Sequence, residues 1–179
     1  GSIYLYRAYI LQIRDGDTYT RKSENNRLRH TPIFASRGVI YDRNNTELAW
    51  NTPGDDPNIS VREYSNVPGI AHVVGYIQYP SKDSAGFYYR EDFEGVDGVE
   101  KYFNSILTGK NGLRLIEVDS RGRVQSGNIV EAPKTGGSVT LSIDTRVHEE
   151  MFNEIKNIAE NVGFAGGAGV MIDVTNGEV

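Results

Sequence analysis

Histidine and carboxylate side chains are the residue types here that could support acid–base or metal chemistry. The three histidines, His30, His72 and His148, lie in three separate segments. Two glutamates follow His148, as in the zinc-binding pattern His-Glu-x-x-His, but the second histidine of that pattern is replaced by Phe152. A solvated helix face explains this run better. A hydrolase that pairs His72 with a carboxylate is the least favoured hypothesis, because a satisfied, half-buried histidine accounts equally well for His72.

Phosphate loops, thiol chemistry and nucleic-acid binding find no support either. The glycine-rich segment 166–169 follows a predicted helix and precedes a predicted strand, whereas a dinucleotide site needs strand, glycines and helix in that order. The absence of cysteine excludes disulfides and Cys-ligated zinc. The net charge is -5 and no Lys/Arg block occurs, which disfavours a nucleic-acid partner. We therefore expect no cofactor and no metal.

The first quarter of the chain changes from helical to strand-like spacing. Apolar residues at 3–13 predict a short helix, too short for the roughly 20 apolar residues of a membrane span. A second helical segment is expected at 17–27. After Pro32 the pattern favours strands at 33–35, 39–41 and 47–50, with Asn44-Asn45 as a hairpin turn.

The remaining elements follow from the same spacing rules. A loop is predicted at 51–58, an apolar strand-like run at 70–77, a loop at 80–92 and a helix at 96–107. A hairpin at 113–132 and a strand at 139–143 come next. Asp144 should cap the longest helix, 145–162, which Gly163 should close before a strand at 169–174.

Four segments in order carry a resemblance to a known family. The first is Arg37-Gly38-Val39-Ile40-Tyr41-Asp42-Arg43-Asn44, followed by Glu47-Leu48-Ala49. The second is Arg62-Glu63-Tyr64 with 71–76, the third is 95–102 with Leu107-Thr108-Gly109, and the fourth is 139–144 with 170–178. Together they resemble the dimerisation, or pedestal, domain of class B penicillin-binding proteins, with the elongation type favoured over the division type.

This resemblance implies an elongated α+β pedestal and a division of the chain into three regions. Residues 1–16 would be the remnant of a membrane-proximal helix, 17–137 the pedestal, and 138–179 the start of a truncated transpeptidase domain. Relatives usually carry a substantial head after the first motif. Here only residues 52–61 intervene, which implies a head reduced to a short loop, natural or engineered.

The family's enzymes cross-link peptidoglycan with a serine from a Ser-x-x-Lys motif, and penicillin acylates that serine. This sequence contains no Ser-x-x-Lys, and Lys134-Thr135-Gly136 is better explained as a turn before a strand than as an active-site triplet. The resemblance therefore implies no catalysis by this chain, and a serine-type D,D-transpeptidase as the full-length parent.

The charged residues of the first and third segments are the candidate site. Arg37 and Arg43 flank a short hairpin, and the third segment supplies Asp97 and Glu100. Because the arginine fork suits a carboxylate, we expect Arg37 or Arg43 to pair with Glu100. Gly38 and Gly98 should allow close backbone approach, and Asp42 belongs to the same structural set. The alternative is a group of separate surface charges.

The resemblance also implies partners and a location. The pedestal would hold the transpeptidase away from the membrane, at the extracytoplasmic face, and dock a membrane glycosyltransferase and scaffold proteins of the elongation or division machinery. Peptidoglycan would be the substrate of the parent, and self-association is expected as a further property. A stand-alone cell-envelope adaptor without a catalytic domain is the alternative.

Overall fold

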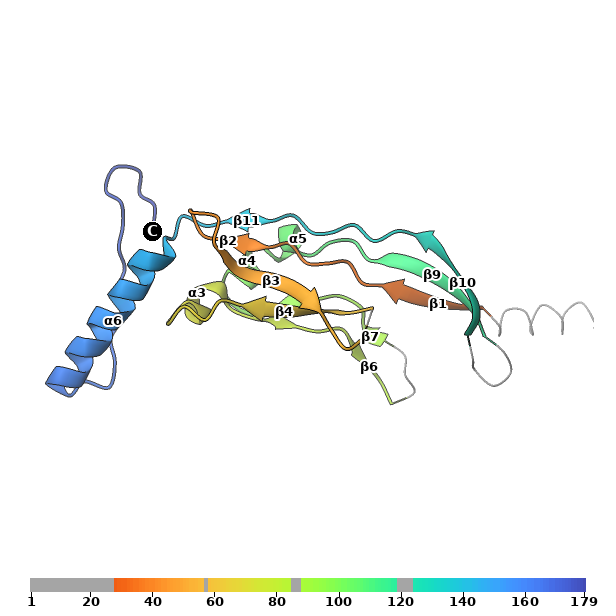
Figure 1. The fold of residues 1–179 in the computed structure, drawn as a ribbon, viewed down its shortest axis with the longest axis horizontal. Helices are drawn as coiled ribbons and strands as arrows, with labels where there is room; N and C mark the ends of the chain where they lie inside the picture. Colours follow the sequence, from red (N-terminus) through yellow and green to blue (C-terminus); the bar gives the residue numbers. More distant parts are fainter. Residues whose placement is uncertain (1–27, 57, 85–87, 119–123) are drawn as a thin grey trace, which may run out of the picture. The chain divides into compact units, whose positions relative to one another are not determined.

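The computed structural model describes residues 28–56, 58–84, 88–118 and 124–179. The predicted helices at 3–13 and 17–27, and with them the predicted membrane-proximal remnant at 1–16, lie outside these residues. The chain divides into two compact units, one made of Gly1–Ile33 with Gly112–Ala132, the other of Phe34–Asn111 with Pro133–Val179. Runs of strands are separated by short helices along the described chain, so the predicted α+β class is confirmed (Figure 1).

The first unit is an antiparallel sheet of order β1-β9-β10, with β1 at Leu28–Ile33, β9 at Gly112–Val118 and β10 at Val124–Glu131. The predicted hairpin at 113–132 is confirmed as β9 and β10. Pro32 is tolerated because β1 lies at the edge of this sheet, where a missing backbone donor costs little. The strand expected at 33–35 is wrong, since β1 ends at Ile33.

The second unit contains a sheet of order β11-β2-β3-β4, with β2 at Ile40–Tyr41, β3 at Glu47–Pro53, β4 at Ser60–Tyr64 and β11 at Val139–Thr140. The predicted turn between β2 and β3 is confirmed, with Asn45 in the left-handed conformation (φ 62°). The loop predicted at 51–58 is shorter than expected, because β3 continues to Pro53 and pairs with Ser60.

Short elements fill the stretch between β4 and β9. They are α3 (Ala71–Val74), β5 (Ile77–Gln78), β6 (Ser81–Lys82), β7 (Tyr88–Arg90), β8 (Glu94–Gly95), α4 (Gly98–Tyr102) and α5 (Asn104–Leu107). Half of the strand-like run at 70–77 is the helix α3, which lies between Gly69 and Gly75, both at φ 77°, and Ile77 alone belongs to a strand, β5. His72 is exposed there rather than half-buried. The loop predicted at 80–92 contains the pair β6–β7, and the helix predicted at 96–107 is broken at Phe103.

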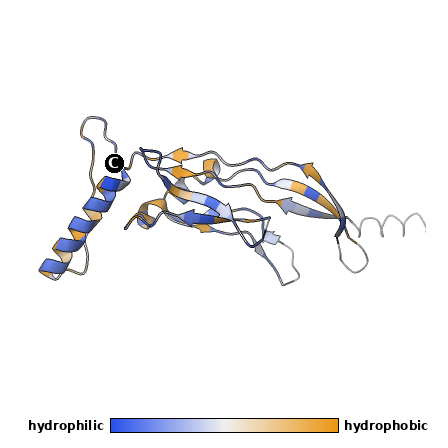
Figure 2. Ribbon diagram, viewed as in Figure 1, coloured by the Kyte–Doolittle hydropathy of each residue, from blue (hydrophilic) through white to orange (hydrophobic). Residues whose placement is uncertain are grey.

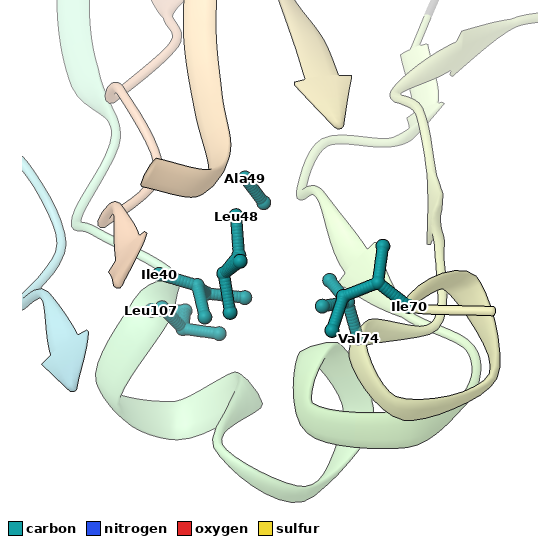
Figure 3. Close-up of a cluster of buried hydrophobic side chains, with 6 residues drawn as sticks. All are labelled: Ile40, Leu48, Ala49, Ile70, Val74 and Leu107. Carbon is teal, nitrogen blue, oxygen red and sulfur yellow. The ribbon is translucent and has the colours of Figure 1, made fainter. Parts of the chain in front are cut away.

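The main core of the second unit lies between its sheet and its short helices. Its buried side chains come from β2, β3, α3 with the residue before it, and α5, and they face one another in Figure 3: Ile40, Leu48, Ala49, Ile70, Val74 and Leu107. A second cluster joins Phe34, Ile77 and Phe93, with Phe34 and Phe93 packed edge to face at 6.2 Å between ring centroids. Small separate clusters of this kind suit short elements that each bury only a few residues.

The C-terminal region of the chain is α6, Thr145–Val162, followed by an irregular segment. The side chain of Asp144 accepts a hydrogen bond from Arg146 N, and Gly163 ends the helix at φ 83°, so both predicted caps are confirmed. Hydrophilic and hydrophobic residues alternate along α6 (Figure 2). No helix in the described residues is long and apolar enough to cross a membrane.

Two predictions after β10 are wrong. The segment 169–174 forms no strand, because no described strand pairs with it; instead it runs back along α6, where Gly167 and Gly169 lie against Ile155 (Figure 1). Lys134-Thr135-Gly136 is extended rather than a turn. Lys134 exchanges backbone hydrogen bonds with Lys110, and Gly136 N donates to Ser36 O.

Candidate functional site

Glu100 is the centre of a buried ionic cluster in the second unit. Its carboxylate accepts hydrogen bonds from Arg37 Nε at 2.6 Å and from Arg62 Nε at 2.8 Å, one on each oxygen. The side chains of Arg37 and Arg62 are 1% exposed and that of Glu100 is 0% exposed. We name these three residues the Glu100 cluster. It brings together the first, second and third sequence motifs.

Arg37 uses its whole guanidinium fork. Besides the bond to the Glu100 carboxylate, Nη1 donates to Thr108 Oγ1 at 2.6 Å and, more weakly, to Phe93 O at 3.4 Å. Nη2 donates to the backbone oxygen of Glu100 at 2.9 Å and to Asn104 Oδ1 at 2.8 Å. A lysine has no planar fork and could not reproduce this set, so the geometry is specific to arginine.

Arg62 is held less completely. Its Nη1 donates to Asn51 Oδ1 at 3.3 Å, and the amide of Asn51 in turn donates to Arg37 O at 2.6 Å. The backbone N–H of Arg62 donates to the Tyr79 hydroxyl at 2.7 Å. Its Nη2 is buried without a hydrogen-bond partner among the described residues. Asn51, opposite Arg62 in the β3–β4 ladder, therefore links the two arginines.

Burial dominates the electrostatics of the cluster. Desolvation lowers the pKa of Arg37, and the neighbouring Glu100 carboxylate opposes this effect. Burial, then the charge of Glu100, raises the pKa of the Tyr64 hydroxyl, which lies 3.5 Å from Glu100 Oε1. The two guanidinium groups share the single carboxylate of Glu100, and the three residues come from different parts of the chain. Removing Glu100 would leave two buried guanidinium groups without a counter-charge, which is the costly case for buried ion pairs.

The other residues predicted for the site have different places. Asp97 is exposed and caps α4 by accepting from Gly98 N at 2.9 Å, so it takes no part in the ion pairs. Gly98 has φ +57°, and a Cβ there would lie 2.4 Å from Val73 O. A Cβ on Gly38 would lie 1.9 Å from Gly137 O. Both glycines therefore stand where two backbones meet.

Arg43 does not reach Glu100. Its Nε donates to Ser142 O at 2.6 Å, its backbone N–H to Ile143 O at 3.0 Å, and its Nη2 pairs with Glu178 at 2.7 Å. This last pair is half-exposed, with side chains 42% and 49% exposed. Arg43 thus contacts the chain on either side of α6, while Arg37 alone supplies the predicted pairing with Glu100.

Asp42 is fully buried, and its carboxylate binds both its near neighbours in the chain and Thr145, which is 103 residues away. Its Oδ1 accepts from the backbone N–H groups of Asn44 and Thr46 at 2.7 and 2.8 Å. Its Oδ2 accepts from Thr145 Oγ1 at 2.8 Å and from Thr145 N at 3.3 Å. One carboxylate therefore closes the β2–β3 turn and also caps the first turn of α6.

Several residues of the site were missed from the sequence. Asn104 accepts from Arg37, from Gly95 N and from Thr108 Oγ1. The spacing of Glu100, Asn104 and Thr108, four residues apart each time, was an available signal, because it puts polar side chains on one helical face. No comparable signal existed for Asn51, whose place depends on the β3–β4 register.

The described residues of the site form a network of buried hydrogen bonds and ion pairs. No group of three or more His, Asp or Glu among them could hold a metal ion. Apart from Arg62 Nη2, the buried charged groups of the cluster bind one another or the backbone, and they join α4, β4 and the 37–43 segment.

Comparison with known proteins gives the class to which this fold and site belong. Residues 57–141 match the family described as Penicillin-binding Protein dimerisation domain. Peptidoglycan D,D-transpeptidase FtsI of Escherichia coli K12 is 30% identical over 128 residues, covering 69% of this chain and 20% of the relative. Probable peptidoglycan D,D-transpeptidase PbpC of Pseudomonas aeruginosa is 24% identical over 228 residues, covering 97% of this chain and 40% of the relative.

Solved structures support the fold. Penicillin Binding Protein 2X of Streptococcus thermophilus aligns with a TM-score of 0.59 at 16% identity, covering 74% of this chain and 32% of that one. The complex between Penicillin-Binding Protein (PBP2) and MreC from Helicobacter pylori gives 0.51 at 19% identity, covering 73% and 38%.

The chain belongs to the penicillin-binding protein dimerisation-domain family. It spans a fifth of the length of the Escherichia coli FtsI relative and about two fifths of PbpC. Relatives named FtsI and relatives named MrdA are both similar to it, so the elongation-type assignment stays a prediction.

Proposed function

We propose that this chain is the non-catalytic pedestal of a peptidoglycan transpeptidase, which positions a catalytic domain and docks partners of cell-wall synthesis. The observation that carries the proposal is the Glu100 cluster. It commits one charged residue from each of three motifs, Arg37, Arg62 and Glu100, to holding the segment 37–43, α4 and β4 together. A rigid body of this kind is suited to holding another domain at a fixed place, and the relatives are named peptidoglycan D,D-transpeptidases.

The proposal assigns residues 17–137 to the pedestal and 138–179 to the start of a transpeptidase domain. It also assigns a reduced head to the connection between β3 and β4. The similarity to PbpC extends over 228 residues, whereas the whole chain has 179, so that relative holds at least 49 residues here that this chain lacks. The short β3–β4 connection, 54–59, is the place where we expect them to be missing.

The parent protein would act at the extracytoplasmic face of the membrane and would cross-link peptidoglycan with a downstream serine. Its partners would be a membrane glycosyltransferase and scaffold proteins of the elongation or division machinery. Two similar structures are described as a peptidoglycan synthase complex and as a complex of PBP2 with MreC, which supports partners of this general kind. Self-association of the pedestal belongs to the same proposal.

Labelling with a fluorescent penicillin tests the catalytic side of this proposal. We expect the 179-residue chain to stay unlabelled, and the full-length protein that contains it to be labelled on a serine and protected by unlabelled penicillin. Labelling of the chain alone would contradict a non-catalytic role. An unlabelled full-length protein would favour the stand-alone adaptor instead.

A competition experiment tests the docking side. The chain, exported to the extracytoplasmic side of cells that carry the full-length protein, should reduce co-purification of that protein with its membrane glycosyltransferase. The Glu100→Ala variant is the comparison: it loses the cluster that holds α4, β4 and the 37–43 segment together, so it should compete less well than the wild-type chain. Undiminished co-purification, with the wild-type chain present in excess, would rule out docking through this domain.

A further inference from the structure

The start of α6 is held by the β2–β3 turn through polar contacts. Asp42 accepts from the hydroxyl and the backbone N–H of Thr145, and Arg43 donates to the carbonyl oxygens of Ser142 and Ile143. We name Asp42 and Arg43 the latch. Asp42 satisfies Thr145 N, and Asp144 satisfies Arg146 N, so two of the free N–H groups at the helix start have partners. The negative charge of Asp42 also suits the positive end of the helix dipole.

Few other contacts fix this helix. Thr145 is its buried residue, whereas Val147, Phe152, Ile158 and Val162 are 37–60% exposed. Away from the latch, α6 packs among the described residues against Gly69, whose Cβ position would lie 2.8 Å from the ring of Phe152 and 3.2 Å from His148 Nε2. An interface this small leaves the direction of α6 dependent on the latch.

The latch is continuous with the Glu100 cluster along the chain. Arg37 lies five residues before Asp42, and β2 is the stretch that joins them. Parallel hydrogen bonds from Val139 N to Val39 O and from Leu141 N to Tyr41 O fix β2 against β11, which leads into α6. At the extended rise per residue, five residues span about 17 Å.

We infer that the segment 37–43 is a strut, anchored at one end by Glu100 and at the other by Thr145, which sets the direction in which α6 leaves the pedestal. A displacement of α4 or β4, such as a docked partner would cause, is passed by the strut to the first turn of α6. This inference rests on the proposed function, since it names how that pedestal would position and regulate a following domain. Each anchor depends on a few specific hydrogen bonds. A segment held in this way can switch between a bound and a released arrangement.

Distances between spin labels on the purified 179-residue chain test the strut. The sequence has no cysteine, so Glu63→Cys on β4 and Asn157→Cys on α6, both at exposed positions, are the only labelling sites. Pulsed electron paramagnetic resonance should give one narrow distance distribution for the labelled double-cysteine chain without further substitutions. Thr145→Val removes the hydroxyl at nearly constant shape and should broaden that distance, as should Arg43→Gln. Thr145→Ser keeps the hydroxyl and should retain the narrow distance.

A further variant tests whether a change at the Glu100 cluster reaches the start of α6. Asn104→Ala removes an acceptor of Arg37, far along the chain from Thr145, and should also broaden the β4–α6 distance if the strut transmits. Circular dichroism controls for folding. If the Thr145→Val variant does not fold, the Arg43→Gln variant, at a half-exposed side chain, still tests the inference. A broad distance distribution in the double-cysteine chain itself would overturn the inference. So would variants whose distance distributions stay as narrow as that of the double-cysteine chain. Because no partner is present, such a failure would leave the docking and penicillin experiments unaffected.

Discussion

Arg37 and Glu100 form a buried ion pair, with 2.6 Å between Nε and Oε2, although 63 residues separate them. Each belongs to a different sequence motif, and Arg62 from a third motif binds the other carboxylate oxygen. In the structure these charged residues of the three motifs therefore bind one another.

Replacing Glu100 with alanine should destabilise the protein strongly. Two guanidinium groups would lose their counter-charge in a buried place, which costs about 3–5 kcal/mol. In a protein of this size the melting temperature should fall by roughly 6 °C or more. Glu63→Ala on the exposed side of β4 is the matched control and should have little effect. A change within about a degree for Glu100→Ala would mean that the cluster contributes little.

Arg37→Lys should also be destabilising, even though it keeps the charge. Lysine would leave Thr108 Oγ1 and the backbone oxygen of Glu100 without the guanidinium donors they have now. Unsatisfied buried groups cost about 1–3 kcal/mol each, so we expect a loss of about 2 kcal/mol or more in urea unfolding. Arg146→Lys, at a side chain 79% exposed, is the control. Equal stability of the two lysine variants would count against the role given to the fork.

Asp42 should make stability depend on pH in the acid range. Burial by itself raises the pKa of Asp42, but hydrogen bonds from Thr46, Thr145 and Asn44 outweigh it and lower the pKa from its ordinary 3.8 to about 2. A group whose pKa is depressed by folding stabilises the native state above its unfolded pKa, and loses that contribution as the pH falls through the folded value.

The measurement is the free energy of unfolding of the wild type and of Asp42→Asn between about pH 7 and pH 2. The wild type should be the more stable at neutral pH, and the difference should shrink between about pH 4 and pH 2. Asp56, Asp144 and Asp173 also have lowered pKa values, but both proteins share them, so their effect cancels. A difference that is constant over this range would exclude the ionised Asp42 as its source.

Gly38→Ala should be destabilising because its Cβ would overlap the carbonyl oxygen of Gly137, 1.9 Å away. Crowding of this kind costs about 1–3 kcal/mol, here by separating β2 from the chain that enters β11. Gly166→Ala is the matched control: nothing lies within 4 Å of its Cβ position, and its stability should change by less than about 0.5 kcal/mol. If both alanines were tolerated equally, the close approach at Gly38 would be unimportant.

Local signals were strong enough to predict several elements. The bounds of α6 follow from the Asp144 cap, the apolar spacing and Gly163, all of which act within a few residues. The Asn44-Asn45 turn needs only a residue that accepts positive φ. In contrast, the strand prediction fails at α3, because four apolar residues between two glycines carry no distinguishable period. The strand expected at 169–174 had the right composition, but a strand forms only where a partner strand supplies hydrogen bonds.

The sequence alone determined the family and the types of residue that form the site, since the motifs Arg37–Asn44, Arg62–Tyr64 and Gly95–Tyr102 are contiguous in the chain. It left Arg37 and Arg43 as equal candidates for Glu100. Only the tertiary structure separated them: Arg37 points into the core beside α4, while Arg43 lies past β2 and binds Ser142 and Glu178. The physical reason is that charge and spacing specify which side chains can pair, whereas strand register and helix packing decide which of them meet.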